Sequence, residues 1–148
     1  MRIVIQRVSR AIVEVDGLEV SSIGQGILVL AAFRKDDSDE ELAWMARKCL
    51  ELRIFEDDDG KMNLSLTDIG GELLVVSQFT LYGNCRKGRR PDYTDSAPPS
   101  DAAGLYRRFI DILESHYPRV SEGVFGAHMN IELLNDGPVT MILDRDPS

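Results

Sequence analysis

Glu72-Leu73-Leu74-Val75-Val76-Ser77-Gln78-Phe79-Thr80-Leu81 begins as an apolar run and then turns abruptly polar. Gly70-Gly71 interrupts the chain just before it, and a short apolar run bounded in this way predicts a buried central strand. The polar end, residues 77–81, needs hydrogen-bond partners if it stays in the core. At the mouth of a pocket the same side chains would face a ligand, and a strand that simply reaches the surface gives the same pattern. Both interpretations stand at this point.

The segments before this strand carry the pattern of an antiparallel sheet. Residues 2–8 and 11–15 alternate apolar and polar side chains, as half-buried strands do. Asp16-Gly17 is a two-residue hairpin signal that leads into a further strand over residues 18–23. Residues 26–33 are almost wholly apolar and predict a second buried strand.

Two helices are predicted beside these strands. Ser38 and Glu41 have the spacing of a capping box, and the helix that follows buries a face formed by Leu42, Met45, Ala46, Cys49 and Leu50. Ser100 is placed to cap a second helix, which ends before Pro118 and buries a face formed by Leu105, Phe109, Ile112 and Leu113.

The C-terminal segment predicts a last pair of strands, residues 129–134 and 139–143. Asn135-Asp136-Gly137-Pro138 joins them, in the simplest interpretation as a hairpin turn whose proline opens the second strand. Residues 144–148 have the look of a frayed tail. Many strands and two helices without strict alternation predict one α+β domain over residues 1–148.

Length and composition fit a single domain of a reducing compartment. Of the 148 residues, 43% are hydrophobic, which suffices for one core without disulfides or a metal. Cys49 lies in a helical pattern and Cys85 in a polar loop, so neither suggests a disulfide framework. The sequence has neither the apolar run of a signal peptide nor that of a membrane span. We therefore expect a cytoplasmic protein without a membrane attachment.

The charge distribution is uneven. The net charge is -8, which speaks against indiscriminate nucleic-acid binding. However, Arg86-Lys87-Gly88-Arg89-Arg90 places four cations within five residues of a long loop, residues 82–99. Such a run is either a solvated loop that favours solubility or a patch that contacts phosphates. Composition alone does not separate the two.

Several common kinds of site are excluded by their motifs. Ser77 lies outside any G-x-S-x-G elbow, and no dinucleotide or P-loop fingerprint occurs. The acidic turn 57–60 cannot be an EF-hand loop, because Phe55 would occupy the first ligand position. His116 and His128 do not have zinc-ligand spacing with the cysteines. We expect no metal and no cofactor. If the protein is an enzyme, its catalytic groups are then backbone groups and hydroxyls.

Few reactions can be catalysed by backbone groups and hydroxyls alone. The hydrolysis of an activated ester, such as an ester on a ribose beside a free hydroxyl, is one of them. It depends on positioning and on stabilising the tetrahedral oxyanion more than on a strong protein base.

Two segments together, residues 77–81 and residues 135–140, resemble the signature pair of the D-aminoacyl-tRNA deacylase family. The opening residues 1–8 look like the first strand of that family. Residues 87–91 and 123–129 also have similar counterparts in it. The resemblance covers essentially the whole chain, in order and with matching length.

The resemblance implies a fold and an assembly. The expected fold is a compact α+β domain with a barrel-like, mostly antiparallel β body flanked by helices, and the expected assembly is a homodimer with its active sites at the subunit interface. Gly137-Pro138 is then a cis peptide that projects into the site of the other subunit, and Arg7 holds it in place. Rigid carbonyls there would accept the substrate's ammonium and leave no room for an L side chain. Such a site must also admit glycine.

The same resemblance implies the substrate and the pocket. The substrate is aminoacylated tRNA, and the catalytic pocket is lined by Ser77, Gln78, Phe79 and Thr80. Thr80 is either a nucleophile or a contributor of its main chain, and the second role is favoured because no base with an assured position lies beside it. Phe125 and Met129 would pack near the terminal adenine, and ordinary core packing is the equal alternative for both.

Two rival functions keep the same fold. One is an RNA-binding module without catalysis that uses residues 86–90 on phosphates. The other is an editing domain similar to that of archaeal threonyl-tRNA synthetase, which would prefer L-serine on the tRNA.

Overall fold

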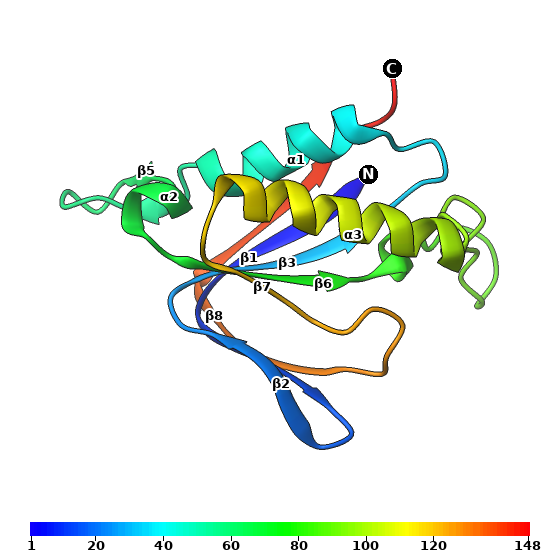
Figure 1. The fold of residues 1–148 in the computed structure, drawn as a ribbon, viewed down its shortest axis with the longest axis horizontal. Coiled ribbons are helices and arrows are strands. Elements are labelled where there is room, and N and C mark those ends of the chain that lie inside the picture. The colour runs from blue at the N-terminus through cyan, green and yellow to red at the C-terminus, as the bar shows by residue number, and fades with distance from the viewer.

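A curved six-stranded sheet forms the centre of the computed structural model, which describes residues 1–148 (Figure 1). The strands are β1 (Arg2–Val15), β2 (Leu18–Ile23), β3 (Gly26–Ala32), β6 (Glu72–Ser77), β7 (Val120–Glu122) and β8 (Asn130–Asp144). The strand β1 pairs antiparallel with β2, β3 and β8, whereas β3, β6 and β7 are mutually parallel neighbours. The sheet is therefore mixed and nearly closed, which confirms the predicted barrel-like α+β domain. No helix is long and apolar enough to cross a membrane.

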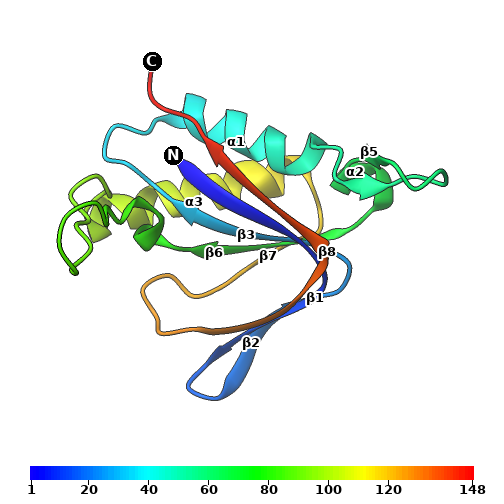
Figure 2. The same ribbon diagram turned by 180° about the vertical axis from the view of Figure 1, so that it is seen from behind.

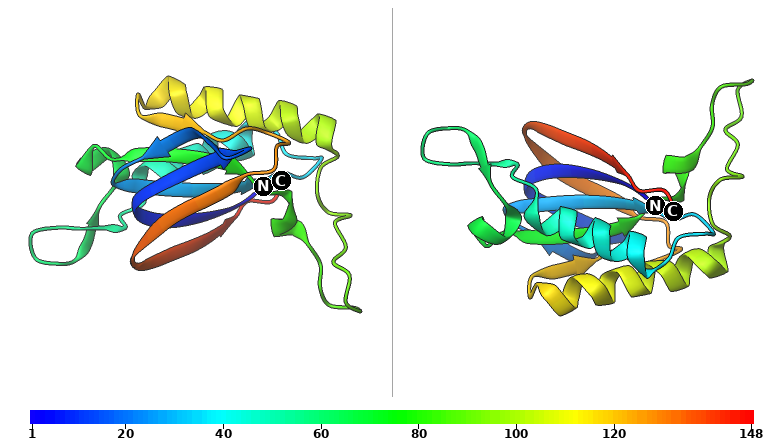
Figure 3. Two further views of the ribbon diagram at one scale, coloured as in Figure 1. Left: turned by 90° about the horizontal axis from the view of Figure 1, so that it is seen from below. Right: turned by 90° about the horizontal axis from the view of Figure 1, so that it is seen from above.

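Helices α1 (Asp39–Glu51) and α3 (Pro99–His116) pack side by side on one face of this sheet (Figures 1 and 3). The main core lies between them and the sheet, where Phe33 meets Phe109 and Tyr106 edge to face. Three short elements complete the fold: a two-stranded ribbon of β4 (Phe55–Glu56) and β5 (Met62–Leu64), α2 (Leu66–Ile69) and the 3-10 helix η1 (Phe79–Tyr82).

The predicted start of the first helix is confirmed, and the predicted start of the second helix is wrong. Ser38 and Glu41 form the predicted capping box of α1, with the Ser38 backbone N–H donating to Glu41 Oε2 at 2.8 Å. The second helix begins at Pro99 rather than after Ser100, and its N-cap, Pro98, offers no side-chain bond. A proline suits the first helical position because its missing N–H would have had no partner inside the helix.

The turn between β1 and β2 also follows the prediction. Asp16 and Gly17 both have positive φ angles, 52° and 77°, as a two-residue hairpin turn requires. The hairpin projects away from the helical layer (Figure 1).

The predicted C-terminal hairpin is wrong, because β8 is one continuous strand. Both of its halves pair with β1, which runs beside it across the back of the sheet (Figure 2). Gln6 pairs with Thr140 and Val8 pairs with Asn135, so residues 136–139 bulge out opposite a single residue of β1. The Asn135 side chain closes the bulge by donating to the carbonyls of Arg7 and Val139, at 3.1 and 3.0 Å. These bonds stabilise the bulge, as the backbone hydrogen bond of a hairpin turn would stabilise a turn.

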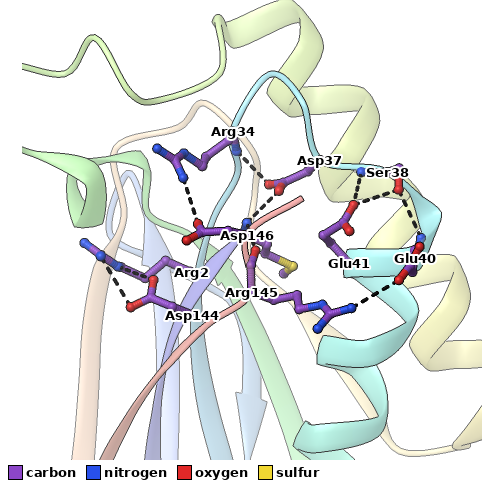
Figure 4. A network of polar contacts seen from close by, with 10 residues as sticks. Arg2, Arg34, Asp37, Ser38, Glu40, Glu41, Asp144, Arg145 and Asp146 are labelled. Carbon is purple, nitrogen blue, oxygen red and sulfur yellow. Dashed lines mark hydrogen bonds and ion pairs between the residues drawn. The ribbon is translucent and has the colours of Figure 1, made fainter. Parts of the chain in front are cut away.

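The predicted frayed tail is ordered at least to Asp146. The Arg145 N–H donates to the Met1 carbonyl at 2.9 Å, and the Met1 ammonium donates to the Arg145 carbonyl at 2.8 Å. Asp146 accepts from Arg34 at 2.7 Å (Figure 4). The tail is ordered because β8 ends beside the start of β1, so residues after Asp144 lie next to Met1 and bond to it.

Candidate active site

A cavity of about 670 Å³ lies where β6 ends, beside the start of α3. Its walls come from residues 76–79, from Tyr93 with residues 96–99, from Ala102 and from residues 125–131. More than half of the lining residues are hydrophobic, and polar groups of Ser77, Gln78 and His128 border them. This volume and this mixture are typical of a site for a small organic group.

The polar end of the central segment is a 3-10 turn and not the continued strand that its sequence suggests. Strand pairing stops at Ser77, which is opposite Ala31, and the Gln78 N–H donates to the Ala31 carbonyl at 2.8 Å. The chain then forms η1, with the Leu81 N–H bonded to the Gln78 carbonyl at 3.2 Å. The turn places the Phe79 side chain outward, 52% exposed. The segment therefore reaches the surface at the rim of the cavity.

The Thr80 hydroxyl has no basic partner within the chain. It accepts a hydrogen bond from the side-chain amide of Gln78 at 2.5 Å, and Thr80 does not line the cavity. A carboxamide cannot take up a proton, so this contact does not activate the hydroxyl as a nucleophile.

The long loop contributes five further lining residues that were missed in the sequence: Tyr93, Ser96, Ala97, Pro98 and Pro99. Tyr93 packs edge to face against Phe79, with ring centroids 5.1 Å apart, and together they form an aromatic edge to the cavity. Ala97 is buried there, and its N–H donates to the Phe33 carbonyl at 2.8 Å. The length of the loop was the only sequence signal of a functional role.

Phe125 and Met129 both line the cavity. Phe125 also packs on Tyr106 of α3, with centroids 5.5 Å apart. The Met129 sulfur accepts the Val124 N–H at 3.4 Å, and it lies 2.8 Å from where a Cβ on Gly123 would be. The two residues therefore combine core packing with a face toward the cavity.

Gly137 and Pro138 are joined by a cis peptide, as expected, and both are exposed. Arg7, only 5% exposed, holds the bulge from below. Its guanidinium donates to the carbonyls of Asp136 and Ile54 at 3.1 and 2.8 Å and lies 3.3 Å from the Asp136 carboxylate. Arg7 therefore contacts this bulge directly through its guanidinium.

One chain does not bring the two signature segments together. Arg7 pairs with Ile27, which in turn pairs with Leu73 near the start of β6. The cavity begins at Val76, near the far end of that strand, about 10 Å further along at the usual rise per residue. Gly137 and Pro138 are accordingly absent from the cavity wall.

The basic run forms the tip of a loop that projects from the body (Figure 3). Asn84 and Asp92 close the loop with two backbone hydrogen bonds of 2.7 and 3.0 Å. The four cations beyond this closure are all exposed, and none forms an ion pair within the chain: Arg86, Lys87, Arg89 and Arg90. Elsewhere, no group of three His, Cys, Asp or Glu side chains is placed to hold a metal ion.

The comparisons agree on one family. The family model described as D-Tyr-tRNA(Tyr) deacylase matches residues 4–144. The chain is 57% identical to a D-aminoacyl-tRNA deacylase of Thermosipho africanus, over 97% of each chain. It is 54% identical to that of Geobacter sulfurreducens, over 97% of this chain and 95% of the other.

Two solved structures have the same fold. One, the c-Myc DNA Unwinding Element Binding Protein, has a TM-score of 0.94 and 43% identity over 99% of this chain and all of the other. A probable eukaryotic D-amino acid tRNA deacylase has a TM-score of 0.83 at 23% identity, over 97% and 98% of the two chains.

Proposed function

Because the chain belongs to the D-Tyr-tRNA(Tyr) deacylase family, it is an enzyme that hydrolyses the ester between a D-amino acid and tRNA, and we propose that the cavity at the end of β6 holds the aminoacyl end of that substrate. The observation that carries the proposal is the composition of this cavity. It is largely apolar, it is bordered by Phe79 at the start of η1, and it contains no carboxylate or cysteine. Such a site can bind and orient an already reactive ester.

The reaction then depends on main-chain groups at the start of η1. Backbone N–H groups of Phe79 and Thr80 stabilise the oxyanion of the tetrahedral intermediate, and the neighbouring ribose hydroxyl helps to activate water. Ser77 and Gln78 border the same pocket and orient the substrate. The bond between Gln78 and the Thr80 hydroxyl supports a main-chain role for Thr80 over a nucleophilic one. Thr80→Ala should therefore keep a substantial part of the single-turnover rate.

A second copy of the chain completes the site. Gly137 and Pro138 are exposed, held firmly by Arg7, and distant from the cavity of their own chain. In a closed, symmetric homodimer each copy can place this bulge over the other's cavity. The carbonyls of the bulge bind the substrate's ammonium and exclude an L side chain, so D-aminoacyl and glycyl esters are accepted. Sedimentation that finds a fully active monomer would refute this arrangement.

The tRNA itself meets two further surfaces. Phe125 and Met129 contact the terminal adenine, because aromatic and thioether groups suit the face of a base. The exposed cations of residues 86–90 contact phosphates of the acceptor stem. The enzyme acts in the cytoplasm, where aminoacylated tRNA is used.

One assay tests this function against its rivals. D-tyrosyl-, L-tyrosyl-, L-seryl- and glycyl-tRNA are each incubated with the enzyme, and the release of the amino acid is followed. The proposal is supported if the D-tyrosyl and glycyl esters are hydrolysed rapidly and the L-tyrosyl and L-seryl esters are not. Preference for L-seryl-tRNA identifies an L-specific editing domain. Binding without hydrolysis identifies a nucleic-acid-binding module, a role that the name of one structural neighbour also suggests.

A further inference from the structure

We propose that Arg2 is a positioning residue for deacylation, because its guanidinium fixes the C-terminal end of the 3-10 turn η1 without lining the cavity. The inference rests on the proposed function, in which main-chain groups of Phe79 and Thr80 meet the substrate. Arg2 itself touches neither the substrate nor the cavity wall. It acts through Leu81 and Tyr82, the last two residues of η1.

The turn is short, with four residues. Gln78 gives no side-chain cap, and the backbone bonds at the two ends of the turn run from the Leu81 N–H to the Gln78 carbonyl and from the Gly83 N–H to the Thr80 carbonyl. A single 3-10 turn is only marginally stable, and the carbonyls at its C-terminal end have no partner within it. Arg2 Nη1 donates to the Leu81 carbonyl at 3.0 Å, which supplies that partner and places a cation where the helix dipole favours one.

A second contact fixes the side chain that follows. The Tyr82 ring is only 7% exposed, and it lies under two guanidinium groups, those of Arg2 at 5.1 Å and of Arg34 at 5.5 Å from its centroid. Burial raises the pKa of the Tyr82 phenol, so the ring stays neutral and the contacts are cation–π interactions. The phenol oxygen has no hydrogen-bond partner, so the two cations and the packing around the ring hold it in place.

The two arginines are themselves held by carboxylates at the end of the chain (Figure 4). Arg2 forms a forked contact with Asp144, at 2.7 and 3.4 Å, and Arg34 contacts Asp146 at 2.7 Å. A forked contact fixes the direction of a guanidinium as well as its distance. The two arginines thereby hold η1 against the paired ends of β1 and β8, so its position does not depend on the loop around it.

This arrangement predicts a slower reaction with unchanged binding. Arg2 and Asp144 are partly exposed, so their removal should affect global stability little. A shift of the main-chain groups of η1 by a fraction of an ångström should lower the rate of the chemical step by about 10- to 100-fold. The affinity for tRNA should stay within about twofold, because Arg2 is not among the proposed tRNA contacts.

The test compares Arg2→Ala with Arg10→Ala as the matched control. Arg10 lies on the same strand and forms a similar partly exposed ion pair, with Glu132 of β8 at 2.7 Å, but has no contact with η1. Two quantities are measured: the single-turnover rate on D-tyrosyl-tRNA at saturating enzyme, and the amide hydrogen exchange of residues 79–83. Arg2→Ala should slow the first and accelerate the second, and Arg10→Ala should change neither.

Two conservative variants complete the experiment. Arg2→Lys should recover part of the rate, since an ammonium can bind either Asp144 or the Leu81 carbonyl but cannot form the fork. Asp144→Asn keeps Arg2 and should show a weaker form of the same defect, which retains a test if Arg2→Ala does not fold. If Arg2→Ala and Asp144→Asn both have the wild-type single-turnover rate and the wild-type amide hydrogen exchange of residues 79–83, the positioning role is refuted. That result would leave the proposed function untouched. The cavity is tested separately by Phe125→Ala, and a wild-type KM in that variant would refute the proposed site instead.

Discussion

Gly137→Ala is the most informative change in the exposed bulge of β8. Gly137 has a φ angle of +122°, a region that L residues adopt at a cost of about 1–3 kcal/mol. A Cβ at this position would lie 2.9 Å from Arg7 Nη2 and 3.1 Å from Val139 Cγ2. Arg7 cannot retreat freely, because its other nitrogens bind the carbonyls of Ile54 and Asp136.

The expected destabilisation combines the backbone strain with the displacement of Arg7. Moving Arg7 out of a buried hydrogen bond costs roughly another 1–3 kcal/mol. Gly60→Ala is the control, since Gly60 also has a positive φ, +74°, but no atom lies within 4 Å of its Cβ position. The control should lose about 1–2 kcal/mol from the backbone alone. Gly137→Ala should lose clearly more, about 2–6 kcal/mol in total.

Urea unfolding at several protein concentrations measures both variants, and the deacylation of D-tyrosyl- and glycyl-tRNA is then followed under conditions where each is folded. We expect Gly137→Ala to be slower than wild type by about tenfold or more, because the added methyl group displaces Arg7 and so shifts the bulge whose carbonyls are proposed to meet the substrate. Gly60→Ala should have the wild-type rate. If Gly137→Ala is dimeric, fully active and still rejects L-tyrosyl-tRNA, the selective wall lies elsewhere.

Three further predictions concern charge and burial. Replacing the four cations of residues 86–90 with glutamine should lower the slope of log affinity against log salt by about 0.7–0.9 for each phosphate that is no longer neutralised, and an unchanged slope would identify a solvated loop. Hydrogen bonds from Ser38 lower the pKa of Glu41, so ionised Glu41 stabilises the fold above its ordinary pKa of 4.5 and loses this effect as the pH falls through the lowered value. Glu41→Gln should thus lower the urea midpoint at pH 7 and match wild type in acid. Burial raises the pKa of the Cys49 thiol to about 12, so iodoacetamide at pH 8 should add one group to the native protein, at exposed Cys85, and two adducts would contradict this.

The sequence predicted those elements whose signals are local. A capping box needs only Ser38 and Glu41 at the right spacing, and a two-residue hairpin turn needs only Asp16 and Gly17. Both are formed as predicted. The bulge of β8 could not be predicted in this way, because its Asp136 carbonyl accepts from Arg7 and its flanks pair with β1, both more than a hundred residues away. Nothing within residues 129–143 distinguishes a hairpin from a bulge.

The candidate site shows the same division. Residues 77–80 were assigned to the pocket from the resemblance to a family motif, because the polar pattern alone fits a strand that reaches the surface equally well. Ser77, Gln78 and Phe79 line the cavity and Thr80 does not. Tyr93 and Ala97 were missed because their place in the cavity depends on how the loop returns to α3, and that return is set by one hydrogen bond to Phe33 in another element. The distance between the cavity and Gly137 also needed the register of β1, β3 and β6.

The strand β1 connects the two halves of the proposed site. Near its start, Arg2 holds the turn that offers main-chain groups to the chain's own cavity. Five residues later, Arg7 holds the bulge that is offered to the cavity of a second copy. Both arginines depend on the same antiparallel ladder with β8, so a change in that ladder should disturb the chemical step and the stereochemical selection together. Separate defects are expected only from changes confined to one arginine, which is why Arg2→Ala should lower the rate and leave L-substrates rejected.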